Sequence, residues 1–180
     1  MTLTRLENPK TQAYYEMKEE VLNVNFPWYW SELATPDLNI GEDEQDFGYY
    51  SHNLLAPPER ELGLRNRQYY SKPISPYLER VHDVVLDILY HNDIKVNNFY
   101  RMAINCVHPT GSNKLSVLHK DHDVAHNNMI TYLTDPDGGE TVCEGEGFIG
   151  QEDDVIVMDG WHHHRPPARK RRVVIVSTYA

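Results

Sequence analysis

The sequence predicts a mainly β fold in which two helices brace one face of a β-sandwich or barrel. A chain of 180 residues with 40% hydrophobic side chains is long and apolar enough to bury one core. Its first half contains two segments with apolar residues at helical spacing. From residue 98 onward, short apolar runs alternate with turn residues, which is typical of strands. We therefore expect one α+β domain over residues 1–180, with helical and irregular support in 1–97 and strands in 98–180.

The two expected helices lie on either side of an irregular stretch. The first starts at Asn8 and Pro9, which suit a helix cap and a first helical position. Its apolar residues are Ala13, Tyr14, Met17 and Val21. The second starts at Ser75 and Pro76. One apolar stripe follows: Tyr77, Leu78, Val81, Val84, Val85, Ile88 and Leu89. Between the helices, residues 25–67 show no sustained period, and we expect short strands only around residues 47–50.

The strands of the second half are separated by turn sequences rich in Pro and Gly. These turns are residues 108–111, 135–139 and 165–167. The expected strands are 99–107, 116–118, 128–134, 140–143, 148–149, 155–158 and 173–179. Six or seven short strands at this spacing predict a sandwich or barrel, and we expect the helices to brace one face of a jelly roll.

Composition and charge exclude several classes of protein. The formal net charge of −10 argues against a binder of duplex nucleic acid, because such binding depends on neutralising phosphates. No apolar run is long enough to cross a bilayer, and residues 1–8 lack the apolar core of a signal peptide. Two cysteines, Cys106 and Cys143, form no disulfide framework. These observations predict a cytoplasmic protein that uses no membrane.

A His-x-Asp pair occurs twice among the ten histidines. The pair His91 and Asp93 falls at the end of the second helix, where residues two apart point in nearly opposite directions. The pair His119 and Asp121 follows a strand-like run, in which residues two apart project from the same side. Only the second pair can therefore supply two convergent metal ligands from local geometry.

A third ligand is expected from the histidine run His162, His163 and His164, which follows the buried strand 155–158. Two histidines and one carboxylate leave positions open on Fe(II) for O₂ and a cosubstrate. A structural zinc site would close its coordination, usually with cysteines, and no cysteine is placed to help. Against this interpretation, an isolated His-x-Asp is most often a chance tripeptide, and a histidine run can consist of surface residues that bind no metal.

Several motifs follow one another in a fixed order in the second half of the chain. They are Leu118 to Asp121, Ile130 to Leu133, Gly138-Gly139-Glu140-Thr141, Asp154 to Gly160, the histidine run, and Arg171 to Val174. This order resembles the 2-oxoglutarate/Fe(II) oxygenases, and most closely their prolyl 4-hydroxylase-like branch, over about residues 99–180. The resemblance implies a double-stranded β-helix, or jelly roll. It also implies Fe(II), O₂ and 2-oxoglutarate, with ascorbate as a stimulant, and a reaction that hydroxylates a substrate while 2-oxoglutarate is decarboxylated to succinate.

The resemblance also implies roles for individual residues. The family carries a basic residue nine to eleven positions after the distal histidine, and Arg172 lies nine after His163. This spacing, and Pro167 four residues later, favour His163 as the distal ligand; His162 and then His164 remain alternatives. A guanidinium can bind the far carboxylate of 2-oxoglutarate through two hydrogen bonds. We expect Arg172 to point inward with Val174 and Val176, and Arg171 to point outward with Val173 and Ile175.

Two further residues, Tyr132 and Thr141, match cosubstrate-contacting positions of the family. As alternatives, Tyr132 would be a core aromatic residue and Thr141 an ordinary strand threonine. His108 stands roughly where related enzymes carry a cosubstrate-contacting tyrosine, which is a departure from the pattern.

The resemblance leaves the substrate open between a prolyl or other protein side chain and a small molecule. Two rival functions are a cupin-like metal-binding module without oxygenase activity, and a zinc hydrolase. The first rival would not need Arg172 or the Gly-Gly-Glu-Thr strand. The second is disfavoured because no glutamate base accompanies the ligands.

Overall fold

The computed structural model describes residues 3–33, 40–56 and 71–180 of the chain. Two helices and a set of mostly antiparallel strands make up this part, so the prediction of a mainly β fold with bracing helices is confirmed. The elements are β1 (Thr4–Leu6), α1 (Gln12–Leu22), β2 (Tyr29–Ser31), β3 (Glu44–Gln45), β4 (Tyr49–Ala56), β5 (Lys72–Pro73), α2 (Leu78–His91), β6 (Phe99–Val107), β7 (Leu115–Ser116), β8 (Asn127–Tyr132), β9 (Thr141–Cys143), β10 (Glu146–Phe148), β11 (Val155–Met158), β12 (His162–His164) and β13 (Arg172–Tyr179).

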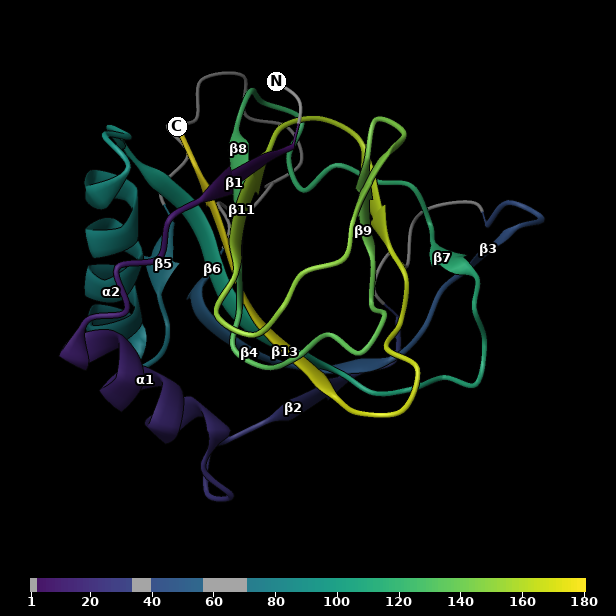
Figure 1. Cartoon of the computed structure of the whole chain (residues 1–180), viewed down its shortest axis with the longest axis horizontal. Helices are drawn as coiled ribbons and strands as arrows, with labels where there is room; N and C mark the ends of the chain where they lie inside the picture. Colours follow the sequence, from purple (N-terminus) through teal and green to yellow (C-terminus); the bar gives the residue numbers. More distant parts are fainter. Residues whose placement is uncertain (1–2, 34–39, 57–70) are drawn as a thin grey trace.

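The strands form one large sheet and two small ones. The eight-stranded sheet has the order β1-β11-β8-β13-β6-β4-β2, with β5 paired to β4. The three-stranded sheet has the order β10-β9-β12, and β3 pairs with β7 in parallel. Figure 1 shows α1 and α2 together on one flank of the large sheet and β9 on the opposite side. Non-consecutive strands are neighbours in the large sheet, so residues far apart in sequence come together.

Two apolar clusters lie on opposite faces of the large sheet. One contains the buried faces of both helices, together with Val173 and Ile175 of β13. The other contains Tyr132, Met158 and Val174, which face the three-stranded sheet. Because side chains alternate along a strand, Arg172 projects from the same side of β13 as Val174. The expected orientation of Arg172 with Val174 is therefore confirmed. The expected outward orientation of Val173 and Ile175 is wrong, because the helices cover the other face of the sheet and bury both residues.

The helices begin later than the sequence pattern suggested. Helix α1 starts at Gln12, and its cap is Thr11, whose hydroxyl accepts a hydrogen bond from the Tyr14 amide at 3.2 Å. Asn8 instead closes a short turn with Lys10, so the expected start at Asn8 and Pro9 is wrong. Helix α2 ends at His91 and buries most of its expected stripe, namely Val81, Val84, Val85, Ile88 and Leu89, whereas Tyr77 and Leu78 are partly buried.

The strand predictions succeed best in the core. The strands 99–107 and 155–158 are confirmed to the residue, as β6 and β11. The strand expected at 116–118 is wrong, because β7 ends at Ser116. Strands β1, β2, β5 and β12 have no local sequence signal, since each is three residues long or shorter. The irregular stretch expected at 25–67 lies partly outside the described residues. Within them, β4 extends over 49–56, beyond the short strands expected around residues 47–50. Neither described helix is long and apolar enough to cross a membrane.

Candidate metal centre

His119 and His162 are held side by side by their backbones. Each amide donates a hydrogen bond to the other residue's carbonyl oxygen, both at 3.0 Å, which forms an isolated antiparallel bridge. Their rings lie with centroids 4.4 Å apart. The bridge therefore joins the His-x-Asp segment to β12, although the two are more than forty residues apart in the chain.

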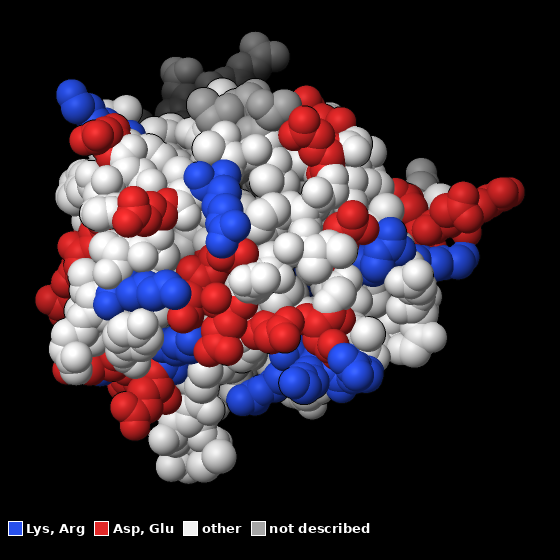
Figure 2. Space-filling view, in the orientation of Figure 1, with Lys and Arg blue, Asp and Glu red and all other residues white. Residues whose placement is uncertain are grey.

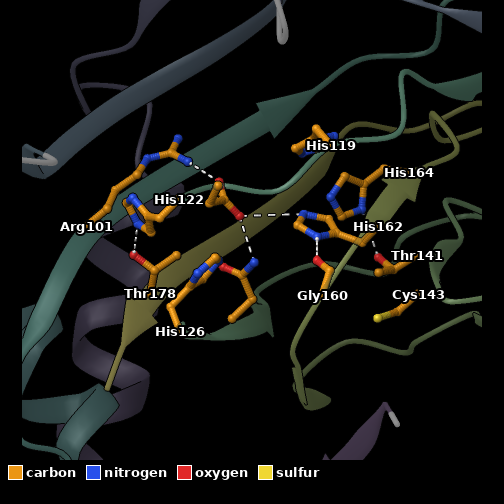
Figure 3. Close-up of polar contacts among 12 residues, drawn as sticks. Arg101, His119, His122, His126, Thr141, Cys143, Gly160, His162, His164 and Thr178 are labelled. Atoms are coloured by element: carbon orange, nitrogen blue, oxygen red, sulfur yellow. Dashed lines mark hydrogen bonds and ion pairs between the residues drawn. The ribbon is translucent and has the colours of Figure 1, made fainter. Parts of the chain in front are cut away.

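Three imidazoles point toward one another at this bridge (Figure 3). One donor atom from each of His119, His162 and His164 lies within 4.8 Å of the others. Each ring uses its Nδ1 atom in a hydrogen bond: His119 with the Val117 carbonyl at 2.8 Å, His162 with the Gly160 carbonyl at 3.2 Å, and His164 with the Thr141 hydroxyl at 3.1 Å. Such bonds fix a metal-binding imidazole and leave Nε2 for the ion.

Asp121 adds a carboxylate to the three imidazoles. Its Oδ2 lies 3.5 Å from His162 Nε2 and accepts a hydrogen bond from the Asn128 amide at 2.7 Å, while Oδ1 pairs with Arg101 at 2.9 Å. Burial on its own would raise the pKa of Asp121, but the charge of Arg101 and the nearby imidazoles hold it well below its usual range. Asp121 is therefore an anion at neutral pH.

The protonation states in this cluster suit a metal ion. Burial lowers the pKa of His162 to about 4, although the charge of Asp121 opposes the shift. Burial also lowers the pKa of His164 well below its usual value. Both imidazoles are therefore neutral near pH 7, which is the form that binds metal. The donor set of neutral imidazoles and one carboxylate fits Fe(II).

His163, which the spacing favoured as distal ligand, does not join this cluster. It is adjacent to His162 on β12, so its side chain projects from the other side of the strand, and its Nδ1 lies 3.9 Å from the Glu44 carboxylate. His91, from the first His-x-Asp pair, lies at the end of α2, 3.4 Å from Glu7.

Arg172 is a buried cation without a carboxylate partner among the described residues. It is 4% exposed, and its Nη1 donates to the carbonyl oxygens of Gly139 at 3.3 Å and Arg165 at 3.2 Å. Its buried Nε has no hydrogen-bond partner within the described part of the chain. A buried, unpaired guanidinium is costly unless an anion binds to it. This observation fits a dicarboxylate such as 2-oxoglutarate.

Gly139 allows Arg172 to take up this position. A Cβ atom at Gly139 would lie 3.1 Å from Arg172 Nη1 and 2.9 Å from the Pro136 carbonyl oxygen. The second glycine of the Gly-Gly-Glu-Thr motif is thus explained by the close approach of the guanidinium.

Tyr132 and Thr141 form a buried hydrogen-bonded chain with His164. The Tyr132 and Thr141 hydroxyls are 2.9 Å apart, and both side chains are almost fully buried. Burial raises the pKa of Tyr132, while Arg172 and the Thr141 bond act in the opposite direction. The structure thus brings Tyr132, Thr141 and Arg172 to the same region as His164.

Arg101 and Asn128 also belong to the site, although the sequence motifs point to neither. Arg101 lies on β6, opposite Thr178 of β13. Asn128 lies on β8, and its Oδ1 is buried without a hydrogen-bond partner among the described residues. Asn128, seven residues after Asp121, stands at the start of a predicted strand and could have been suspected. Nothing local in the sequence links Arg101 to Asp121.

Four basic residues lie between the histidine run and Arg172, namely Arg165, Arg169, Lys170 and Arg171, and two of them pair with acidic side chains. Arg165 contacts Glu140 at 3.2 Å, and Arg169 contacts Asp137 at 2.9 Å. Figure 2 shows basic and acidic side chains side by side along the lower part of the visible face. This part of the surface therefore carries both basic and acidic side chains.

No family model matches the chain, and no curated protein matches it in sequence. Its fold is similar to that of solved oxygenases. An oxidoreductase of the 2OG-Fe(II) oxygenase family from Burkholderia pseudomallei matches with a TM-score of 0.68 and 16% identity, over 99% of this chain and 84% of that chain. A prolyl hydroxylase from Trichoplax adhaerens, in complex with a hypoxia inducible factor peptide fragment, matches with a TM-score of 0.59 and 15% identity, over 98% and 82%.

A Pseudomonas putida prolyl-4-hydroxylase is a third similar structure, with a TM-score of 0.53 and 14% identity, over 98% of this chain and 91% of that chain. The chain therefore shares the fold of 2-oxoglutarate/Fe(II) oxygenases and prolyl hydroxylases. The resemblance seen in the sequence motifs is confirmed at the level of the fold.

Proposed function

We propose that this protein is an Fe(II)- and 2-oxoglutarate-dependent oxygenase with the double-stranded β-helix architecture of its structural neighbours. The observation that carries the proposal is the convergence of three imidazoles and one carboxylate beside a buried arginine that has no carboxylate partner among the described residues. Neither rival function accounts for Arg172, since a simple metal-binding module or a zinc hydrolase needs no buried guanidinium.

In this proposal His119, Asp121 and His162 hold Fe(II). His162 takes the role that the sequence spacing favoured for His163, because His162 shares the backbone bridge with His119 and lies beside Asp121. Arg172 lies ten positions after His162, which is still within the family's range of nine to eleven. Asn128 and Arg101 orient the Asp121 carboxylate, so that Oδ2 faces His162.

Arg172 would bind the far carboxylate of 2-oxoglutarate. Tyr132 and Thr141 supply hydroxyl donors close to the guanidinium. A charged pair at such a poorly solvated place is strong only if the geometry is good, and Gly139 permits the close fit. When bound, Fe(II) would supply the chemistry by which O₂ oxidises both partners: one oxygen atom goes to the substrate as a hydroxyl group and the other to 2-oxoglutarate, which is released as succinate and CO₂.

We take a peptide side chain, with proline as the first candidate, to be the substrate. The support is the similar fold of the Trichoplax adhaerens prolyl hydroxylase, whose structure contains a peptide fragment. Succinate release in the presence of proline-containing peptides, with product masses read by mass spectrometry, tests this part of the proposal. An increase of one oxygen mass in a peptide is the expected result.

Anaerobic titration with Fe(II) and then 2-oxoglutarate tests the reaction class. The weak visible charge-transfer band of the chelate should appear for the wild type and for His91→Ala, the matched control from the helical His-x-Asp pair. It should be lost in His119→Ala. If the wild type bound Fe(II) without developing the band, the metal-binding module without oxygenase activity would be the better description.

A further inference from the structure

His164 is a third imidazole at the metal centre, beyond the two that the proposed function requires. It lies on β12 two residues after His162, so both side chains project from the same side of the strand. The ring of His164 has its centroid 5.2 Å from that of His162 and 5.9 Å from that of His119. A surface histidine would have no reason to point into this cluster.

The free ring nitrogen of His164 is available to an ion. Its Nδ1 is bonded to Thr141, and the structure gives its Nε2 no hydrogen-bond partner among the described residues. Two donors bound to one ion at about 2.1 Å each can be at most about 4.2 Å apart. The donor atoms of the three histidines lie within 4.8 Å of one another, so a small side-chain adjustment brings all three into reach of one ion.

His164 also lies close to Arg172 along the chain. Arg172 Nη1 donates a hydrogen bond to the carbonyl oxygen of Arg165, the residue that directly follows His164, at 3.2 Å. Through Thr141, His164 is also connected to Tyr132. A cosubstrate that reached from the metal to Arg172 would therefore pass near the His164 ring.

We propose that His164 binds the metal as a fourth protein ligand when no cosubstrate is present, and leaves that position when 2-oxoglutarate binds. This inference rests on the proposed metal centre. A six-coordinate ion with three imidazoles and Asp121 has two open positions, which a two-pronged cosubstrate would fill, leaving none for O₂. Displacement of His164 from the metal frees one coordination position for O₂. His164 would thus hold the metal tightly before cosubstrate arrives and compete with cosubstrate afterwards.

The test measures Co(II) binding to the full chain by competition with a chelator, and the visible Co(II) spectrum, without 2-oxoglutarate. His164→Ala removes the ligand, and His164→Gln removes it while retaining side-chain volume. We expect both substitutions to weaken Co(II) binding about 10-fold to 100-fold and to change the spectrum. Loss of a residue that only hydrogen-bonds to a metal ligand already lowers metal affinity by that factor. His163→Ala, the adjacent residue facing Glu44, is the matched control and should bind Co(II) as the wild type does.

A second titration adds 2-oxoglutarate to the Co(II)-loaded proteins. If His164 competes with the cosubstrate, both His164 variants should bind 2-oxoglutarate several-fold more tightly than the wild type. Wild-type Co(II) affinity and an unchanged spectrum in the His164→Gln variant would overturn the inference, even if His164→Ala were unstable. Weaker cosubstrate binding in both variants would overturn the displacement step.

The outcome separates this inference from the proposed function. If the wild type bound no Co(II), or if Asp121→Ala bound it normally, the metal centre and the inference would fail together. If Co(II) bound but 2-oxoglutarate did not, the proposed oxygenase function and the displacement step would fail. The fourth-ligand role would then be decided by the His164 affinities alone.

Discussion

His162 and His163 are neighbours on β12, yet they face different partners. His162 Nε2 lies 3.5 Å from the Asp121 carboxylate, whereas His163 Nδ1 lies 3.9 Å from the carboxylate of Glu44. The alternation of side chains along a strand separates them. The choice of distal ligand can therefore be tested with two substitutions at adjacent positions.

We expect His162→Ala to lower Fe(II) affinity more than about 100-fold. Loss of a residue that only hydrogen-bonds to a metal ligand already lowers metal affinity about 10-fold to 100-fold, and loss of the ligand itself should cost more. His163→Ala should bind Fe(II) like the wild type. Anaerobic metal titration of both variants measures the difference. The reverse order of effects would restore His163 as the distal ligand.

Arg172→Ala should weaken 2-oxoglutarate binding and leave Fe(II) binding nearly unchanged. Loss of one partner of a buried charge pair costs about 3–5 kcal/mol, which corresponds to about 100-fold or more in affinity. Arg172→Lys should recover part of the loss, because it retains the charge but not the two-pronged geometry. Isothermal titration calorimetry of the metal-loaded proteins measures both.

The matched control for this prediction is Arg171→Ala, since the adjacent Arg171 is exposed. An exposed ion pair contributes only about 0–1 kcal/mol, so its loss should change cosubstrate affinity little. Equal effects of the Arg171 and Arg172 variants would remove Arg172 from the cosubstrate site.

Gly139→Ala should impair the cosubstrate site through Arg172. The added Cβ would meet Arg172 Nη1 at 3.1 Å and the Pro136 carbonyl oxygen at 2.9 Å, so the guanidinium must shift. Overpacking of this kind lowers the free energy of unfolding by about 1–3 kcal/mol. We expect weaker 2-oxoglutarate binding, normal Fe(II) binding and a lower Tm by calorimetry.

A double variant shows whether Gly139→Ala changes 2-oxoglutarate affinity through Arg172. If Gly139→Ala acts by displacing Arg172, it should have no further effect on cosubstrate affinity in an Arg172→Ala background. Additive losses of affinity in the double variant would show that Gly139 acts by another route.

The sequence predicted the core strands because their apolar runs and flanking turns agree, as in β6 and β11. It could not choose within the histidine run. Spacings of nine and ten residues to Arg172 both suit the family, and the inward face of β12 is set by its bridge to His119, a long-range contact. Arg101 could not be predicted for a similar reason. It lies on β6 opposite Thr178 of β13, and the Thr178 hydroxyl contacts His122, the residue after Asp121, at 2.7 Å. The local sequence pattern thus predicts which types of residue occur at the site. The register of the sheets decides which of these residues come into contact.

Outside the metal centre, Asp153 ties α1 to the turn before β11 and should make stability depend on pH. Its carboxylate accepts hydrogen bonds from the Tyr14 hydroxyl, at 2.7 Å, and from Lys18. Burial would raise the pKa of Asp153, but the bonds from Lys18 and Tyr14 outweigh it and lower the pKa. The folded state therefore favours the ionised form more than the unfolded chain does.

The sign of the effect follows from linkage. A carboxyl group whose pKa is lower in the folded state contributes its full stability above the unfolded pKa, about 3.9 for Asp, and loses it as pH falls through the folded value. Asp153→Asn should thus lower the free energy of unfolding by about 1.5–3 kcal/mol near pH 7, the size of a hydrogen bond to a charged group. The difference from the wild type should shrink below about pH 4. Urea unfolding from pH 3 to pH 7 measures it.

Glu152→Gln is the matched control, because Glu152 pairs with the same Lys18 but its side chain is 54% exposed. An exposed pair should contribute about 0–1 kcal/mol, with little change over this pH range. If the Asp153 and Glu152 variants followed the same pH curve, the buried contacts of Asp153 with Tyr14 and Lys18 would not be the source of the pH dependence. A constant deficit in Asp153→Asn down to pH 3 would instead assign the loss to packing of the turn, because packing does not titrate.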